Sequence, residues 1–117
     1  MNIQEFYSMI GADSGSVIRR FSSEALVRKY LGRFLSDGTY AQLSSAMEAG
    51  DAETAFRAAH TLKGLALNLE LPPLTAASSE LTELLRNKQD ISSAARDAFR
   101  TLTALYDDII RQIALIE

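Results

Sequence analysis

Residues 51–68 read DAETAFRAAHTLKGLALN, and the spacing of their apolar side chains decides the fold. Alanine and leucine recur every three or four positions, as they do along one face of an α-helix. At about 100° per residue, these side chains form one face without any polar residue, which we expect to be buried. It comprises Ala55, Ala58, Ala59, Leu62, Leu65, Ala66 and Leu69. The stretch is therefore predicted to be a helix, from about Asp51 to about Asn68, that packs against other helices.

Short signals divide the rest of the chain into further helices. Gly50 suits the left-handed position that ends one helix, and Asp51 suits the N-cap that begins the next. Pro72–Pro73 prevents a helix immediately before it and favours a new one after it. Asn2 and Glu5 resemble a capping pair at the start of a short first helix. We therefore predict helix boundaries at these three places.

Other boundaries rest on weaker signals. Residues 12–21 carry ambiguous signals, and we expect a loop with one helical turn there. A helix that starts at residue 22 or 23 would have its apolar positions at Leu26, Tyr30 and Phe34. A capping box formed by Thr39 and Gln42 is predicted to start the next helix, and Asp90 is predicted to cap the last one.

The composition is that of an all-α protein. Alanine and leucine dominate the long segments, proline occurs only at Pro72 and Pro73, and few stretches alternate with a period of two. Amphipathic helices joined by short connections predict an antiparallel four-helix bundle with an additional short N-terminal helical segment. We expect a single domain over residues 1–117, with the bundle at about 22–117 and a cap segment at 1–21.

Composition also excludes several classes of function. The chain has 117 residues, a net charge of −3, no cysteine and one histidine, His60. Without cysteine there is no disulfide, zinc–thiolate or iron–sulfur site, and one histidine cannot make a multi-histidine metal site. The 12 basic and 15 acidic residues are interspersed, which argues against nucleic-acid binding. No signal peptide or membrane-spanning run is present, so we expect a cytoplasmic protein without a membrane partner.

The helix of residues 51–68 turns its histidine outward. His60 lies about 160° from the middle of the apolar face, and Arg57, Lys63 and Gly64 share its exposed side. A glycine inside a helix costs on the order of 1 kcal/mol relative to alanine, and here it leaves room for a partner to approach the imidazole. A lone histidine usually has no special role. This combination nevertheless favours phosphoryl chemistry, because neutral imidazole is a nucleophile and lysine supplies positive charge to phosphoryl oxygens.

Two apolar side chains lie on the outer half of the same helix, one and two turns from His60. Phe56 and Leu67 are either buried where helices cross or part of an apolar docking patch around the histidine. With Arg57, they are our candidate partner-binding residues.

The residues around His60 also resemble a known family. His60-Thr61-Leu62-Lys63-Gly64, preceded by Ala58-Ala59 and followed by Asn68-Leu69, is similar to the signature of histidine-containing phosphotransfer (HPt) domains. Residues 34–51 and 74–85 are similar to the helices that flank this signature in the family. The resemblance covers most of the chain from about residue 22 onward, and it implies a four-helix bundle.

The resemblance implies a phosphocarrier in two-component signalling, without autonomous kinase activity. His60 would be phosphorylated on Nε2, Lys63 would neutralise the phosphoryl charge, and Gly64 would leave space for the partner's active site. The implied partners are receiver domains of response regulators and a hybrid sensor histidine kinase. We expect Mg²⁺ on the receiver, no cofactor or metal on this chain, and a monomer.

One position departs from the family pattern. Glu70 stands where these domains usually have a second glycine. It lies about 15 Å along the helix axis from His60, too far to touch a phosphoryl group. The departure therefore concerns the turn conformation and partner preference rather than phosphotransfer.

Two other classes of function stay open at this stage. An interaction module would bind its partner without phosphorylation, and its binding would not depend on His60. A phosphatase would release inorganic phosphate from phosphorylated receivers with turnover. No additional general base for hydrolysis is evident in the sequence, so the phosphatase ranks last.

Overall fold

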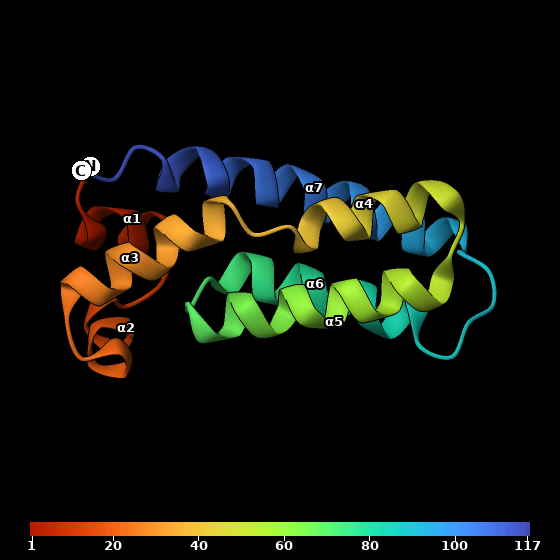
Figure 1. Cartoon of the computed structure of the whole chain (residues 1–117), viewed down its shortest axis with the longest axis horizontal. Coiled ribbons are helices and arrows are strands. Elements are labelled where there is room, and N and C mark those ends of the chain that lie inside the picture. Colours follow the sequence, from red (N-terminus) through yellow and green to blue (C-terminus); the bar gives the residue numbers. More distant parts are fainter.

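The computed structural model describes residues 1–117 and is entirely helical, with no strand. The molecule measures 42 × 22 × 22 Å, and its longer helices run along the long axis (Figure 1). None of the helices combines the length and the apolar character that crossing a membrane would need. The seven helices are α1 (Ile3–Met9), α2 (Ser14–Phe21), α3 (Glu24–Leu35), α4 (Thr39–Ala49), α5 (Ala52–Asn68), α6 (Pro72–Leu85) and α7 (Ser93–Ile113).

Helices α4, α5, α6 and α7 run in alternating directions along the molecule (Figure 1). Helix α5 packs against α4 and α6, and α6 also packs against α7. Helices α3 and α4 follow one another along the length of α7, separated by a short break (Figure 1). On α7, Tyr106 contacts both: its ring centroid lies 4.2 Å from that of Tyr40 in α4 and 6.0 Å from that of Phe34 in α3. Helices α3 and α4 thus share one side of the molecule.

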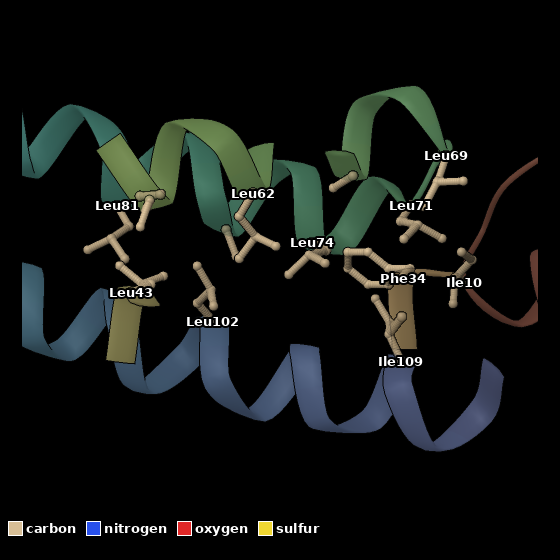
Figure 2. Close-up of a cluster of buried hydrophobic side chains, with 14 of the residues drawn as sticks. Ile10, Phe34, Leu43, Leu62, Leu69, Leu71, Leu74, Leu81, Leu102 and Ile109 are labelled. Carbon is tan, nitrogen blue, oxygen red and sulfur yellow. The ribbon is translucent and has the colours of Figure 1, made fainter. Parts of the chain in front are cut away.

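The core is one cluster of 27 buried residues to which all seven helices contribute. In its middle, leucines from α4, α5, α6 and α7 face one another (Figure 2). The predicted apolar face of α5 is buried, apart from Leu65, which is half-buried at its edge. Its alanine side chains are short, so the neighbouring helices can pack closely against it. Because this face is buried, the opposite face of α5 lies at the surface.

The boundaries predicted from strong local signals are confirmed. Asn2 and Glu5 form a capping box at the start of α1, with each side chain accepting a hydrogen bond from the other's backbone N–H. Gly50 ends α4 with a φ of 73°, a left-handed conformation that glycine adopts without strain. The Asp51 side chain then accepts a hydrogen bond from the Thr54 N–H and caps α5.

The N-terminal half of the chain differs from the prediction in two respects. Residues 14–21 form a regular helix capped by Asp13, rather than a loop with one turn. In α3, the buried side chains are Val27, Leu31 and Phe34, whereas Leu26 and Tyr30 stay 37% and 36% exposed. Two overlapping apolar stripes fit this helix, and tertiary packing selects one of them. Tyr30 instead packs on Phe21, with their ring centroids 5.1 Å apart.

Two predicted caps are wrong, one by a single residue and the other by two residues. Thr39 is buried inside the first turn of α4, and its N–H donates to Asp37 at 2.8 Å, so no capping box with Gln42 forms. Asp90 is exposed in the loop before α7, where Ser92 provides the cap by accepting from the Ala95 N–H. Both sites offer several polar side chains in succession, and the path of the loop decides which one meets the helix start.

The N-terminal helices are tied to the far end of α5 and to the C-terminus. The buried Tyr7 hydroxyl donates to the Leu69 carbonyl at 2.7 Å, and Arg20 pairs with Glu70 at 3.1 Å. At the other side, the Met1 ammonium donates to the Leu115 carbonyl at 3.1 Å. The two termini therefore lie side by side (Figure 1).

Candidate functional site

Helix α5 presents His60 to solvent because the opposite face of the helix is buried. The cap at Asp51 sets the start of the helix, and the helical repeat then places alanines inward and His60 outward. On the same side, Lys63 is half-buried and Gly64 is exposed. The structure thus places all three residues together at the surface, as the helical spacing predicts.

Gly64 has no structural reason to be glycine. Its φ is not positive, so its backbone conformation is open to any residue. A Cβ atom added at this position would have no heavy atom within 4 Å. Neither the backbone conformation nor the packing within this chain requires glycine at position 64. Its effect is to leave open space at the surface beside His60.

Phe56 combines both of the roles considered for it. It is half-buried and packs against the core, yet its ring lies parallel to the His60 imidazole, with centroids 6.2 Å apart and 1° between the planes. The guanidinium carbon of Arg86 lies 5.1 Å from the centroid of the same ring. Phe56 therefore links His60 to a cation directly after the last residue of α6, which the sequence pattern did not reveal.

The two other predicted partner-binding residues differ in whether their side chains already pair with a neighbour in this chain. Leu67 is 56% exposed and has its side chain available at the surface. Arg57 is exposed but pairs with Glu53 at 2.8 Å, one turn toward the start of α5. Its charge is therefore directed away from His60, and Lys63 is the α5 cation that stays on the histidine's side.

Helix α6 forms the second wall of the site. Between α5 and α6, beside Lys63 and Leu67, there is a hollow of about 520 Å³. The α6 side chains that line it are Pro72, Thr75, Ala76 and Ser79. In an antiparallel helix pair, residues at equal distances before and after the turn lie level with one another. Counting outward from the turn could therefore have indicated which part of α6 faces His60.

The α6 wall carries a charged pair near the histidine. Arg86 donates from Nε and Nη2 to the two carboxylate oxygens of Glu83, both at 3.0 Å. This hydrogen bonding lowers the pKa of the Glu83 carboxyl, and the nearby charges of Arg86 and Lys63 lower it further; a positive charge on His60 would act in the same direction. Glu83 is therefore an ionised group within electrostatic reach of His60.

Glu70 has a left-handed backbone conformation at the turn between α5 and α6. Its φ is 55°, in the left-handed region that favours glycine. The departure from the family pattern therefore leaves a left-handed turn in place between α5 and α6. The Glu70 carboxylate pairs with Arg20 of α2, and both residues line the hollow beside Lys63.

No group of three or more histidine, aspartate or glutamate side chains is arranged to hold a metal ion. The chain matches the family model of the Hpt domain over residues 30–112, from the second half of α3 to the last turn of α7. No curated protein and no solved structure matches the chain. The family match includes the whole of α5 and α6, and so both walls of the site.

Proposed function

Because the chain belongs to the Hpt domain family, we propose that it is a phosphocarrier of a multistep phosphorelay with His60 as its phosphoacceptor. Hpt domains transfer phosphoryl groups through a histidine and interact with receiver domains and histidine kinases. His60 is the only histidine in the chain. The observation that supports the proposal best is its exposure on α5 beside Lys63 and the open space at Gly64.

In the proposed reaction, His60 takes the phosphoryl group from an aspartyl phosphate of a receiver. The Nε2 lone pair attacks phosphorus in line, and the N–P bond forms while the P–O bond breaks. The electron pair of the broken bond leaves with the aspartate carboxylate, and the Nδ1 proton stays on the imidazole ring. Transfer to the next receiver reverses these steps.

The neighbouring residues have supporting roles in this proposal. Lys63 offsets the negative charge of the phosphoryl oxygens, and Gly64 lets the receiver bring its aspartate within reach of Nε2. Phe56 and Leu67 supply apolar contacts to the docked receiver, and Arg57 contributes at the rim. We expect the receiver to bring the Mg²⁺ that its own phosphoryl chemistry needs.

We also propose that the helical body is a variant of the antiparallel four-helix bundle. Helices α3 and α4 together would be one member, and α5, α6 and α7 the other three. The support for this is that α3 and α4 lie in succession along α7, while α5 packs against α4 and α6. The break between them, at residues 36–38, would then be an interruption of a single bundle helix.

The test uses a receiver domain charged on its aspartate with acetyl phosphate, in the presence of Mg²⁺. Acid-labile label is expected to move to the wild-type chain in stoichiometric amounts and not to His60→Gln. A folded His60→Gln protein that still accepts acid-labile label would overturn the assignment. Circular dichroism and urea unfolding of the variant establish that it is folded.

The same experiment separates the alternatives. Receiver binding that is indifferent to His60→Ala, with no label on the wild-type chain, would identify an interaction module. Release of inorganic phosphate by substoichiometric amounts of the chain, without a labelled histidine, would identify a phosphatase. Either result would replace the phosphocarrier proposal.

A further inference from the structure

The Glu83–Arg86 pair lies within electrostatic reach of His60 and is connected with it through Phe56. Both side chains are exposed, and the pair lies at the end of the helix. The two hydrogen bonds at 3.0 Å hold the guanidinium in one orientation, and its contact with Phe56 does so too. Phe56 in turn lies parallel to the imidazole. One short series of contacts therefore connects the pair with the phosphoacceptor.

The pair places opposite charges around a group whose own charge changes during transfer. Neutral imidazole becomes a ring that carries a phosphoryl group with about two negative charges. A carboxylate near this group destabilises it, whereas a guanidinium stabilises it. Because Arg86 is engaged by Glu83, the two effects oppose one another.

We propose that Glu83 and Arg86 set the phosphoryl-transfer equilibrium of His60, with Glu83 favouring release of the phosphoryl group and Arg86 favouring its retention. This inference rests on the proposed function of His60. Neither residue is catalytic, since both act through their charge rather than through contact with the reacting atoms. The pair would thereby influence how much phosphoryl group stays on this chain and how much moves to a receiver.

The Arg57–Glu53 pair on α5 is a less suitable candidate for this role. It is also exposed, and Arg57 reaches Thr54 as well as Glu53, both nearer the start of the helix. It has no aromatic contact that connects it with His60. Only the α6 pair combines a fixed guanidinium with a ring that lies parallel to the imidazole.

The experiment measures how a fixed amount of phosphoryl group is distributed at equilibrium. A receiver domain is charged with acetyl phosphate, freed of the excess reagent, and mixed with the chain in the presence of Mg²⁺. The ratio of phosphorylated chain to phosphorylated receiver is then measured within the lifetime of both species. Glu83→Gln is expected to raise this ratio about 3- to 10-fold, and Arg86→Gln to lower it by a similar factor. The double variant should return close to the wild-type ratio.

Two further variants separate charge from structure. Arg86→Lys keeps the positive charge and should give a ratio closer to wild type than Arg86→Gln. On α7, Asp108 and Arg111 form an exposed pair with the same spacing, at 2.9 Å, and Asp108→Asn should leave the ratio unchanged. Raising the salt concentration to about 0.5 M should reduce the effects of the α6 variants, since salt screens exposed charges.

The results distinguish this inference from the proposed function. If forward and reverse rates change equally in Glu83→Gln and the ratio stays the same, the pair affects docking only and the inference is wrong. If His60 is labelled but the ratio does not respond to either charge, the inference fails while the phosphocarrier stands. If label reaches His60→Gln, the proposed function itself fails.

Discussion

At position 64, the proposed function and the open space beside the helix lead to a direct test. Gly64→Ala is expected to stabilise the protein by up to about 1 kcal/mol, because alanine favours the helix and its Cβ meets no neighbour. Gly64→Gln should also leave the fold intact but slow phosphotransfer at least about 10-fold, by filling the space through which a receiver reaches His60. Urea unfolding and single-turnover transfer rates check the two parts.

Gly32 provides the matched control for this residue. It lies inside α3, is exposed, and would also meet no heavy atom within 4 Å if it carried a Cβ. Gly32→Gln should therefore stabilise the helix in the same way without changing transfer rates. Equal transfer rates in the Gly64 and Gly32 variants would contradict the role of open space beside His60.

At the scale of the helix, Asp51 determines how firmly α5 begins. Hydrogen bonds from Thr54 lower the pKa of the Asp51 carboxyl. The folded state therefore holds the ionised form more strongly than the unfolded state, whose pKa is about 3.9. The resulting stability is present above that pH and is lost as the pH falls through the lower pKa of the folded state.

Two substitutions test this cap. Asp51→Ala should lower the melting temperature at pH 7 by roughly 2–6 °C, because the Thr54 N–H loses its partner. Asp51→Asn should keep most of the cap but lose the part of the stability that depends on pH below 4. Transfer rates should stay unchanged in both, since Asp51 lies about 13 Å along the axis from His60. Identical acid unfolding of wild type and Asp51→Asn would contradict the assignment.

Some helix bounds and buried faces can be predicted from signals that lie close together in the sequence, and others cannot. The start and end of α5 follow from Asp51 and from the apolar spacing, because both involve residues within about one turn of each other. In α3 the same kind of signal fails. Leu26 and Tyr30 fit the helical repeat as well as Val27 and Leu31 do, and the packing of other helices decides which pair is buried.

At the scale of the whole molecule, Tyr7 connects the N-terminal helices with the end of α5. Burial raises the pKa of the Tyr7 hydroxyl well above its ordinary value near 10, and the charge of Glu70 adds to the effect. Above pH 10 the unfolded state therefore loses this proton first. The free energy of unfolding should fall with rising pH, by about 1.4 kcal/mol per pH unit for this group.

Tyr7→Phe is the corresponding test. At neutral pH it should destabilise the protein by about 1–2 kcal/mol, because the buried Leu69 carbonyl loses its donor. Above pH 10 its stability should fall less steeply than that of the wild type. Burial also raises the pKa of Tyr106, which contributes to both proteins, so the difference in slope isolates Tyr7. Parallel pH profiles of unfolding would rule out a protonated, buried Tyr7.

Much of the site was determined by the amino-acid sequence alone. Helical periodicity, caps and breaks act between residues close together in the chain, so the all-helical class, the bounds of α5 and the outward position of His60 could be predicted. Lys63 and Gly64 follow from the same repeat, since they lie three and four positions after the histidine. The resemblance of these residues to the HPt signature is confirmed by the family match.

The tertiary structure decided what depends on residues far apart in the chain. Only the pairing of α5 with α6 brings Arg86 onto Phe56 and Glu83 near His60. The attachment of Tyr7 to Leu69 likewise joins residues on helices that are distant in sequence. Such contacts depend on how the helices dock, and many pairings would satisfy the same apolar faces. The outward position of the histidine could therefore be predicted from the sequence, whereas the charges that surround it depend on helix packing.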